Sequence, residues 1–234
     1  MRVRTRGGGR PAMSRSGFAA QAREGFQDRR HAGRLLAERL RELELVDPVV
    51  LGLARGGVPV AAEVAGALDA PLRVAVARKI GAPGQPELAL GAVTAQGPAT
   101  YDPRLLRSFH LDEQALQSDC EREREEARRR ERAYQKGDPL PLAGRDVVLV
   151  DDGLATGATA RAAVRMLRES SPRSVVLAVP VGAPDAVAAL RREADTVVCV
   201  LQPVAFAAVG QWYRNFRATT DEEIYQVLDE VDTG

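Results

Sequence analysis

The stretch that decides the fold is VVLVDDGLATGAT, residues Val147 to Thr159. Four aliphatic residues lead directly into two adjacent carboxylates, Asp151 and Asp152, and a loop of small residues follows them. In an open parallel sheet, ligands bind beyond the carboxyl ends of the strands, so both aspartates are expected at a binding edge. The stretch therefore predicts a buried strand, a binding loop and the start of a helix.

The loop after the aspartates has the properties of an anion site. Exposed backbone N–H groups at a helix start, the helix dipole and the hydroxyls of Thr156 and Thr159 all favour a phosphate. The two carboxylates beside it would accept hydrogen bonds from hydroxyl groups. A ligand with hydroxyls next to a phosphate satisfies both halves, and ribose 5-phosphate is such a ligand.

Other motifs fit this stretch less well. A Walker A loop requires a Lys before its last Ser or Thr, and a dinucleotide fingerprint requires GxGxxG; the stretch has neither. Two acids after a strand are also typical of Mg²⁺ sites in phosphatases and receiver domains, but those sites do not explain the TGAT that follows. The plain structural alternative is an ordinary strand–turn–helix with Asp152 as a turn residue.

The rest of the chain alternates apolar runs with segments of helical spacing. We expect strands at 49–53, 71–77, 91–95, 147–150, 174–181 and 196–200, and helices at 28–43, 58–68, 111–135, 159–169 and 185–193. Uniformly apolar strands in this order predict an α/β fold, with a parallel sheet covered by helices on both faces. The Gly- and Pro-rich segment 81–91 is expected to be a loop.

Composition limits the class of protein. The 234 residues carry a net charge of +1, which points to no polyanionic partner. No apolar run reaches the ~18 residues of a membrane span, and the N-terminus has no apolar signal region, so we expect no membrane partner. Cys120 and Cys199 lie in unrelated contexts, which indicates a reducing cytoplasm rather than a disulfide framework.

Two segments are strongly charged. Residues 1–25 are rich in Arg and poor in apolar residues, and we interpret them as a disordered basic tail, within which Met13 offers a later start. An RNA-binding arm is the less favoured interpretation, because one GGGR is not a repeat array. Around 109–137, charges of both signs indicate a helix with a solvated face and i,i+4 pairs rather than a binding surface.

A second candidate anion site follows the first core strand, in LARGGVPV, residues 53–60. Arg55 stands beside Gly56 and Gly57, and two glycines allow a backbone to approach a ligand closely. A plain turn between a strand and a helix is the alternative.

The segment VVLVDDGLATGAT resembles the phosphoribosyl pyrophosphate signature of type I phosphoribosyltransferases: four hydrophobic residues, two acids, small residues and TGxT. Ala158 stands where many members have Gly. LGLARGGVPVA, ARKIGAPGQPELALGAV and VGQWYRNF are similar to a bacterial and archaeal subgroup that is assigned by sequence and has no settled acceptor. The resemblance covers roughly 26–231. It implies a Rossmann-like sheet, a small hood subdomain at 202–231 with part of the N-terminal region, and a helical insertion at about 109–137 within one domain, 26–234.

The resemblance implies transfer of a phosphoribosyl group from phosphoribosyl pyrophosphate to a nitrogenous base, with release of pyrophosphate. Asp151 and Asp152 would bind the ribose hydroxyls and stabilise positive charge on the ring. The 5′-phosphate would be held by Ala155, Thr156, Gly157, Ala158 and Thr159. The diphosphate would be held by Arg55, Gly56 and Gly57, where family members often have a cis peptide.

Further roles also rest on the resemblance. Arg78 and Lys79 would neutralise the leaving pyrophosphate at the root of a mobile catalytic loop, 81–91; a solvated basic pair is the alternative. Mg²⁺ would be held largely by the ligand. A homodimer is implied, since members commonly form one.

The hood would carry the acceptor specificity. Its aromatic residues would either stack on the acceptor or form the core of the hood; they are Phe206, Trp212 and Tyr213. The 6-oxopurine branch of the family usually reads the carbonyl of its base with a Lys early in the strand after the signature helix. Here that strand, 174–181, has no Lys, which argues against hypoxanthine or guanine as the acceptor. Two other functions stay open: a regulatory module that senses phosphoribosyl pyrophosphate or a nucleotide, and a hydrolase of phosphorylated sugars.

Overall fold

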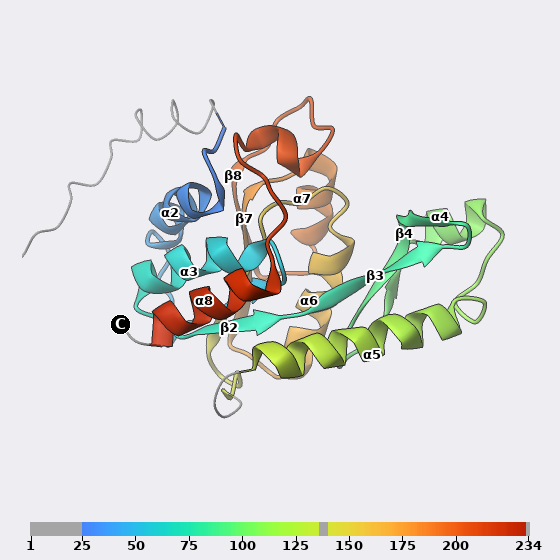
Figure 1. The fold of residues 1–234 in the computed structure, drawn as a ribbon, viewed down its shortest axis with the longest axis horizontal. Coiled ribbons are helices and arrows are strands. Elements are labelled where there is room, and N and C mark those ends of the chain that lie inside the picture. Colours follow the sequence, from blue (N-terminus) through green and yellow to red (C-terminus); the bar gives the residue numbers. More distant parts are fainter. Residues whose placement is uncertain (1–24, 136–139, 233–234) are drawn as a thin grey trace, which may run out of the picture.

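The computed structural model describes residues 25–135 and 140–232, and the predicted basic tail with Met13 lies outside them apart from Gly25. The elements, drawn in Figure 1, are α2 (Arg29–Leu40), β1 (Val49–Leu53), α3 (Gly57–Leu68), β2 (Leu72–Ala75), β3 (Ala77–Ala82), β4 (Gln85–Thr94), β5 (Thr100–Tyr101), α4 (Pro103–Ser108), α5 (Gln117–Tyr134), β6 (Asp146–Val150), α6 (Ala158–Glu169), β7 (Ser174–Val181), α7 (Pro184–Leu190), β8 (Thr196–Leu201), the 3₁₀ helix η1 (Val209–Trp212) and α8 (Asp221–Asp232).

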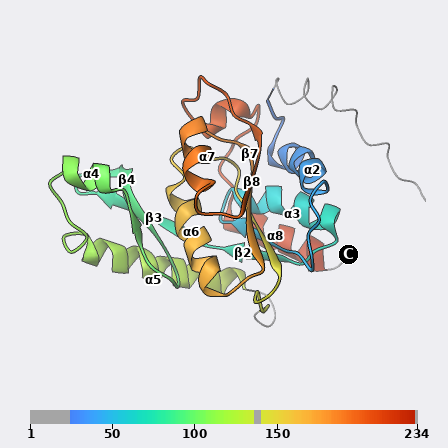
Figure 2. The ribbon, with the colours of Figure 1, turned by 180° about the vertical axis from the view of Figure 1, so that it is seen from behind.

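The body of the molecule is a parallel sheet in the order β2-β1-β6-β7-β8, as the alternating pattern predicts. Successive residues of a strand point to opposite faces. Val148 and Val150 of β6 accordingly pack with α2, α3 and α8, whereas Val147 and Leu149 pack with α6 and α7. The two views in Figures 1 and 2 show helices on both faces of this sheet, so the α/β prediction is confirmed.

The helix predicted to begin at Asp28 does so for the expected reason. The Asp28 carboxylate accepts a hydrogen bond of 2.8 Å from the backbone N–H of His31, which satisfies one of the unpaired donors of the first turn. Leu36 and Leu40 then lie four residues apart on the buried face of α2. This cap fixes the position of Arg29, the first residue of the helix.

An arm projects from the body (Figure 1). The antiparallel strands β3, β4 and β5 pack against α5 and α4 around a small core that includes Ile80, Leu90 and Leu116. The prediction of a loop at 81–91 is wrong. Ala82 pairs with Gln85, so Pro83 and Gly84 alone form the turn, and Gly84 takes the positive φ of +75° that this residue tolerates.

The cause of that error is long-range pairing. The Gly- and Pro-rich composition indicates a break in regular structure, but only two residues are needed for the break. Gln85 and the residues from Ala89 onward pair across the hairpin, with a shift of register at Gly81, and the weak strand predicted at 91–95 is the second half of β4. Strand propensity depends strongly on such context.

The C-terminal helix also differs from the prediction, which placed 202–231 in the hood. Ile224, Val227 and Leu228 of α8 lie at helical spacing and are buried in the same core as α3. The aromatic cluster of the predicted hood ends at Phe216, and its N-terminal contribution is Phe26, which bridges to Tyr213. In the part of the chain that is described, no helix is long and apolar enough to cross a bilayer.

Gly66 offers a test of the packing of α3. It lies inside the helix, and a Cβ added there would meet no atom within 4 Å. We expect Gly66→Ala to raise the free energy of unfolding by about 0.5–1 kcal/mol, because alanine loses less backbone entropy in a helix. Urea unfolding of the two proteins measures this. A loss of stability would contradict the described packing of α3.

Candidate functional site

The two carboxylates of the signature follow β6 at the carboxyl edge of the sheet. The backbone N–H of Asp152 donates to Oδ1 of Asp151 at 2.9 Å. Both residues are partly accessible, and the Asp152 side chain exposes 15% of its surface. Two like charges therefore lie side by side in a region with little solvent.

Arg29 is the main residue of this site that the sequence analysis missed. Its Nε and Nη2 donate to Oδ2 of Asp152 at 2.9 and 2.8 Å, across 123 positions of sequence. Its Nη1 donates to the carbonyl of Arg217 at 2.7 Å, and its guanidinium lies 4.1 Å from the centre of the Phe216 ring. Arg29 thus joins the signature to the hood segment by three separate contacts.

A signal for Arg29 was present in the sequence. It occupies the first turn of a helix, where the helix dipole disfavours a positive charge. A basic residue in that position points to an acidic partner elsewhere, but it does not say which one.

The pKa values of the pair move in the same direction. Burial, with the charge of Asp152 as a second cause, raises the pKa of Asp151 well above its usual value, while Arg29 and Lys79 oppose the shift. Burial also raises the pKa of Asp152, against the effect of the Arg29 guanidinium. Shifts of this kind are common at functional sites, where charges are held ready for a ligand.

The loop 54–57 contains two glycines because it approaches the end of β6 and the Asp152 carboxylate very closely. A Cβ on Gly56 would lie 2.0 Å from Oδ2 of Asp152, and one on Gly57 would lie 2.5 Å from the carbonyl oxygen of Val150. The peptide between Ala54 and Arg55 is cis, the geometry that the family resemblance led us to expect here. The loop 54–57 therefore packs directly on the end of β6.

The loop 155–159 leads into α6 as predicted. Gly157 is the N-cap with φ of +74°, and Ala158 is the first helical residue. Ala158 departs from the glycine of many family members without conflict, because a helical position needs no glycine. The first-turn N–H groups of α6 are available to an anion in the way that helix starts generally are.

A cavity of about 770 Å³ joins these segments. Four of the predicted ligand contacts line it, and they are Arg55, Arg78, Lys79 and Thr159. The turn of the β3–β4 hairpin lines it as well, through Pro83 and Gly84. The hairpin thus occupies the place where a mobile loop was expected.

Helix α5 contributes to the same cavity, which corrects the interpretation of its charges as a solvated face alone. The expected pairs exist, for example Arg130 with Glu126 at 2.6 Å. A further set of its side chains lines the cavity, and these are Asp119, Arg122, Glu123 and Arg130. The sequence could not reveal this, because it depends on α5 packing against β3.

The two basic residues at the start of β3 have different surroundings. Nε and Nη2 of Arg78 contact Oε2 of Glu123 at 3.0 and 2.9 Å. Lys79 is exposed and forms no ion pair with any described residue, although its charge acts on Asp151. Arg55 also lines the cavity, and its guanidinium lies 3.8 Å from the carboxylate of Asp221 in α8. Among the described basic residues that line the cavity, Lys79 is therefore the one without an ion pair.

The aromatic residues of the predicted acceptor site belong to the hood core. The Tyr213 ring lies 5.2 Å from that of Phe26 and 4.9 Å from that of Phe216, and its hydroxyl donates to the carbonyl of Asp152 at 2.6 Å. Phe206 and Trp212 pack on the same cluster and are half-buried. Of the two interpretations left open, the structure supports the core for Tyr213.

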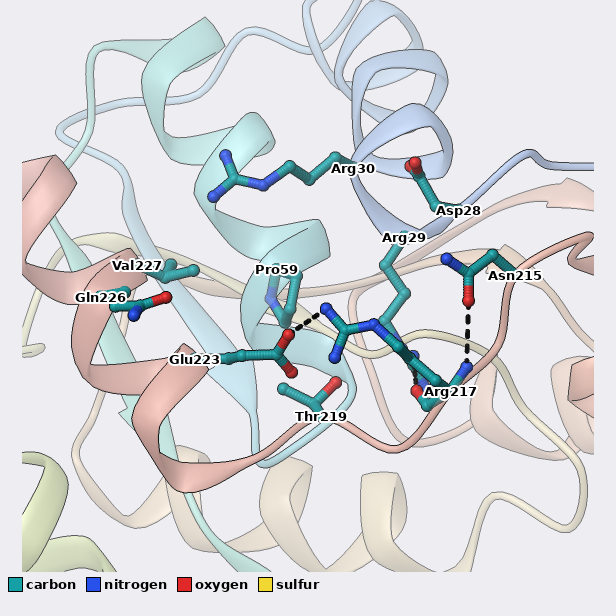
Figure 3. Close-up of a pocket in the computed structure, with 10 residues that line it drawn as sticks. All are labelled: Asp28, Arg29, Arg30, Pro59, Asn215, Arg217, Thr219, Glu223, Gln226 and Val227. Atoms are coloured by element: carbon teal, nitrogen blue, oxygen red, sulfur yellow. Dashed lines mark hydrogen bonds and ion pairs between the residues drawn. The ribbon is translucent and has the colours of Figure 1, made fainter.

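Figure 3 shows a smaller cavity, of about 280 Å³, which Arg29 also lines. Its charged side chains have partners within the protein. Arg29 pairs with Asp152, Arg30 with Glu230, and Arg217 with Glu223. The larger cavity, with Lys79, is therefore the better candidate for a ligand site, although Asp151, Asp152, Gly56 and Gly57 are not among its lining residues. Within the described ranges, no group of three or more His, Cys, Asp or Glu residues is placed to hold a metal ion.

The sequence model of the phosphoribosyl transferase domain matches residues 26–211. The chain belongs to this family. A Mycobacterium tuberculosis protein provisionally named a phosphoribosyl transferase is 50% identical over 205 residues, which are 87% of this chain and 46% of that protein. The chain thus spans about half the length of the curated relatives it matches.

Two further matches differ in extent. The protein TT1426 from Thermus thermophilus, known from a crystal structure, is 48% identical with a TM-score of 0.74, and the match covers 88% of this chain and 98% of that one. A uracil phosphoribosyltransferase of Acidovorax is 43% identical over only 73 residues, 31% of this chain and 32% of that protein. The phosphoribosyl transferase domain is thus supported over most of the chain, and the uracil enzyme resembles only a part.

A substitution at Gly56 tests the contact between the loop 54–57 and Asp152. Its φ of −63° suits any residue, so the effect of Gly56→Ala would come from the added methyl group alone. We expect the methyl to displace the Asp152 carboxylate from Arg29 and to lower the free energy of unfolding by about 1–3 kcal/mol. Gly66→Ala in the same helix segment is the matched control. Equal stability of the two variants would refute the close contact.

The raised pKa of Asp151 predicts a pH-dependent effect of Asp151→Asn. The ionised carboxylate destabilises the fold above its raised pKa, and the penalty disappears below the unfolded pKa, where both states are protonated. Asparagine can still accept the Asp152 N–H. We expect Tm to rise by about 2 °C or more at pH 8, and the gain to vanish near pH 3. Thermal scans at both pH values measure it, and a lower Tm at pH 8 would contradict the assigned cause.

Proposed function

We propose that this chain transfers the phosphoribosyl group of phosphoribosyl pyrophosphate to a nitrogenous acceptor and releases pyrophosphate. The observation that carries the proposal is the arrangement around Asp151. The carboxylate pair, the small-residue loop before α6 and the cavity with Lys79 and Arg55 meet at one edge of the sheet. A ribose with a phosphate at one end and a diphosphate at the other has matching groups.

In this reaction the carboxylates have different tasks. Oδ2 of Asp152 is held by Arg29, which opposes the rise in the pKa of Asp152, and Asp152 orients the loop. Asp151 accepts hydrogen bonds from the ribose hydroxyls and stabilises the positive charge that grows on the ring as the C1–oxygen bond breaks. Because its pKa is raised, Asp151 is also the better group to take the proton of the acceptor nitrogen as the new C1–nitrogen bond forms.

The phosphates occupy the two loops. The 5′-phosphate is held by 155–159, where the start of α6 supplies N–H groups and dipole. The diphosphate lies against the loop at Arg55, Gly56 and Gly57, and it leaves toward Lys79, whose charge compensates the product anion. The chemistry then depends on positioning and electrostatics, with no covalent protein intermediate.

Mg²⁺ fits this site through hard oxygen ligands. Asp151 supplies carboxylate oxygens at the edge of the sheet, and the diphosphate and the ribose hydroxyls supply the others. The ion would neutralise charge on the diphosphate. Asp151 would orient the hydroxyls that share the ion.

The ordered β3–β4 hairpin bears on the choice between catalysis and sensing. A mobile loop with Arg78 and Lys79 at its root would favour catalysis, since a lid excludes water from the reacting centre. Here Arg78 is paired with Glu123, and the segment forms a β-hairpin whose register shifts at Gly81. Release of pyrophosphate must therefore be measured directly, because binding of phosphoribosyl pyrophosphate alone fits a sensor equally well.

The acceptor is a flat nitrogenous ring bound near the hood. Phe206 and Trp212 are the aromatic candidates that stay half-buried, and β7 carries no Lys for a 6-oxopurine. Uracil belongs in an acceptor screen because of the short match to a uracil enzyme. We also propose a cytoplasmic location, in line with the two free cysteines, and a homodimer, in line with the family.

The test is calorimetric titration of phosphoribosyl pyrophosphate with Mg²⁺ into the wild type and into Asp151→Asn/Asp152→Asn. We expect binding by the wild type and at least about a hundredfold weaker binding by the variant, since charge-assisted hydrogen bonds are lost. A screen of bases for pyrophosphate release then separates a transferase from a sensor. If the wild type does not bind, both hypotheses fail and a sugar-phosphate hydrolase is next in line.

A further inference from the structure

A second groove lies between the arm and the body. Its volume is about 860 Å³, and it is distinct from the cavity that contains Lys79. On the arm side it is lined by α4 and the residue before it. On the body side it is lined by α7 and by Ala155 and Thr156 of the loop before α6. Figures 1 and 2 show α4 on the arm and α7 on the body.

The groove is lined by arginines that lack partners. The guanidinium groups of Arg104 and Arg107 on α4, and of Arg192 just after α7, form no ion pair with any described residue, and all three side chains are exposed. A fourth lining arginine, Arg161, has its Nε 3.1 Å from Oε1 of Glu193. By contrast, the exposed arginines of α5 are paired, as Arg129 is with Glu126 at 2.7 Å.

Acidic groups in the groove do not balance these charges. The Asp102 carboxylate caps α4, where it accepts from the backbone N–H groups of Arg104 and Leu105 at 2.8 and 3.3 Å. Asp185, in the first turn of α7, is the other acidic lining residue. Three unpaired guanidinium groups thus face one carboxylate that has no capping role, and the groove has an excess of positive charge.

The shape of the groove comes from small side chains. Its body wall is rich in alanine, with Ala155, Ala183, Ala186, Ala188 and Ala189. Methyl groups leave an open, partly apolar floor, and the arginines stand around it. A groove of this volume, with a partly apolar floor and a few convergent polar groups, is typical of a small-molecule site.

We propose that this groove binds a ligand with linked phosphates, at a site separate from the cavity that contains Lys79. Planar guanidinium groups recognise phosphate oxygens in pairs, and arginines from different elements can hold successive phosphates of one chain. The ligand is a nucleoside polyphosphate, whose ring would lie on the alanine floor, or a free polyphosphate. A concave groove with three free cations suits such a small anion better than a long nucleic acid, which requires an extended basic surface.

The position of the groove also implies coupling to the ribose-phosphate site. Ala155 and Thr156 belong to the loop that we assign to the 5′-phosphate, so a bound polyanion would lie beside it. Like charges on two sides of one loop repel, and each ligand would weaken the other. This coupling rests on the proposed function, whereas binding in the groove does not.

The test titrates inorganic tripolyphosphate, and separately ATP, into the full chain at about 0.15 M salt, without phosphoribosyl pyrophosphate. The groove variant is Arg104→Gln/Arg107→Gln, in which glutamine keeps the helix propensity of exposed positions. The matched control is Arg129→Gln/Arg132→Gln on the exposed side of α5, which removes the same charge outside the groove. Thermal scans confirm that the variants are folded.

We expect tripolyphosphate to bind the wild type, the groove variant to bind at least about tenfold more weakly, and the control to bind within about twofold of the wild type. Tighter binding of ATP with the same arginine dependence supports a nucleotide as the natural ligand, and equal binding supports free polyphosphate. The proposal is overturned if the wild type binds neither probe, if the groove variant binds as tightly as the wild type, or if the control loses as much. Because no phosphoribosyl pyrophosphate is used, failure here is distinct from failure of the transferase proposal.

Discussion

The ion pair between Arg29 and Asp152 is the interaction on which the arrangement of this site depends. Two adjacent carboxylates at the end of β6 repel each other, and burial disfavours their charge further. Arg29 compensates one of the two charges through two donors on a single oxygen. The second carboxylate, Asp151, keeps its raised pKa and its access to a ligand. One guanidinium thus makes two chemically identical side chains unequal.

The same ion pair positions segments that are remote in sequence. Arg29 is held in place by the Asp28 cap of α2, by the Arg217 carbonyl and by the Phe216 ring. Tyr213 approaches from the hood and donates to the Asp152 carbonyl. The hood is therefore attached to the backbone and the side chain of one signature residue. A shift of the hood would therefore displace the Asp152 backbone and the Arg29 side chain that holds its carboxylate.

Local features of this site could be predicted from the sequence, and long-range ones could not. The strand, the carboxylates and the helix start in 147–159 follow from neighbouring residues, and so does the cap at Asp28. The partner of Asp152 lies 123 positions away, and one sequence contains nothing that selects Arg29 among so many arginines. For the same reason, the charges of α5 predicted a solvated helix face. The contact of its Glu123 with Arg78 depends on how α5 packs against β3, which the sequence does not show. The hairpin at 81–91 was missed because pairing across strands overrode a composition typical of loops.

The loop 155–159 has a different environment on each side, and this gives the small residues there a second purpose. Thr159 lines the cavity with Lys79, while Ala155 and Thr156 line the arginine groove. Both spaces thus border the same short loop, in which Gly157 packs so closely on Leu190 that a Cβ would lie 2.8 Å from its Cδ1. Because the loop leads into the first turn of α6, charge bound in either space would act on the backbone N–H groups of that turn.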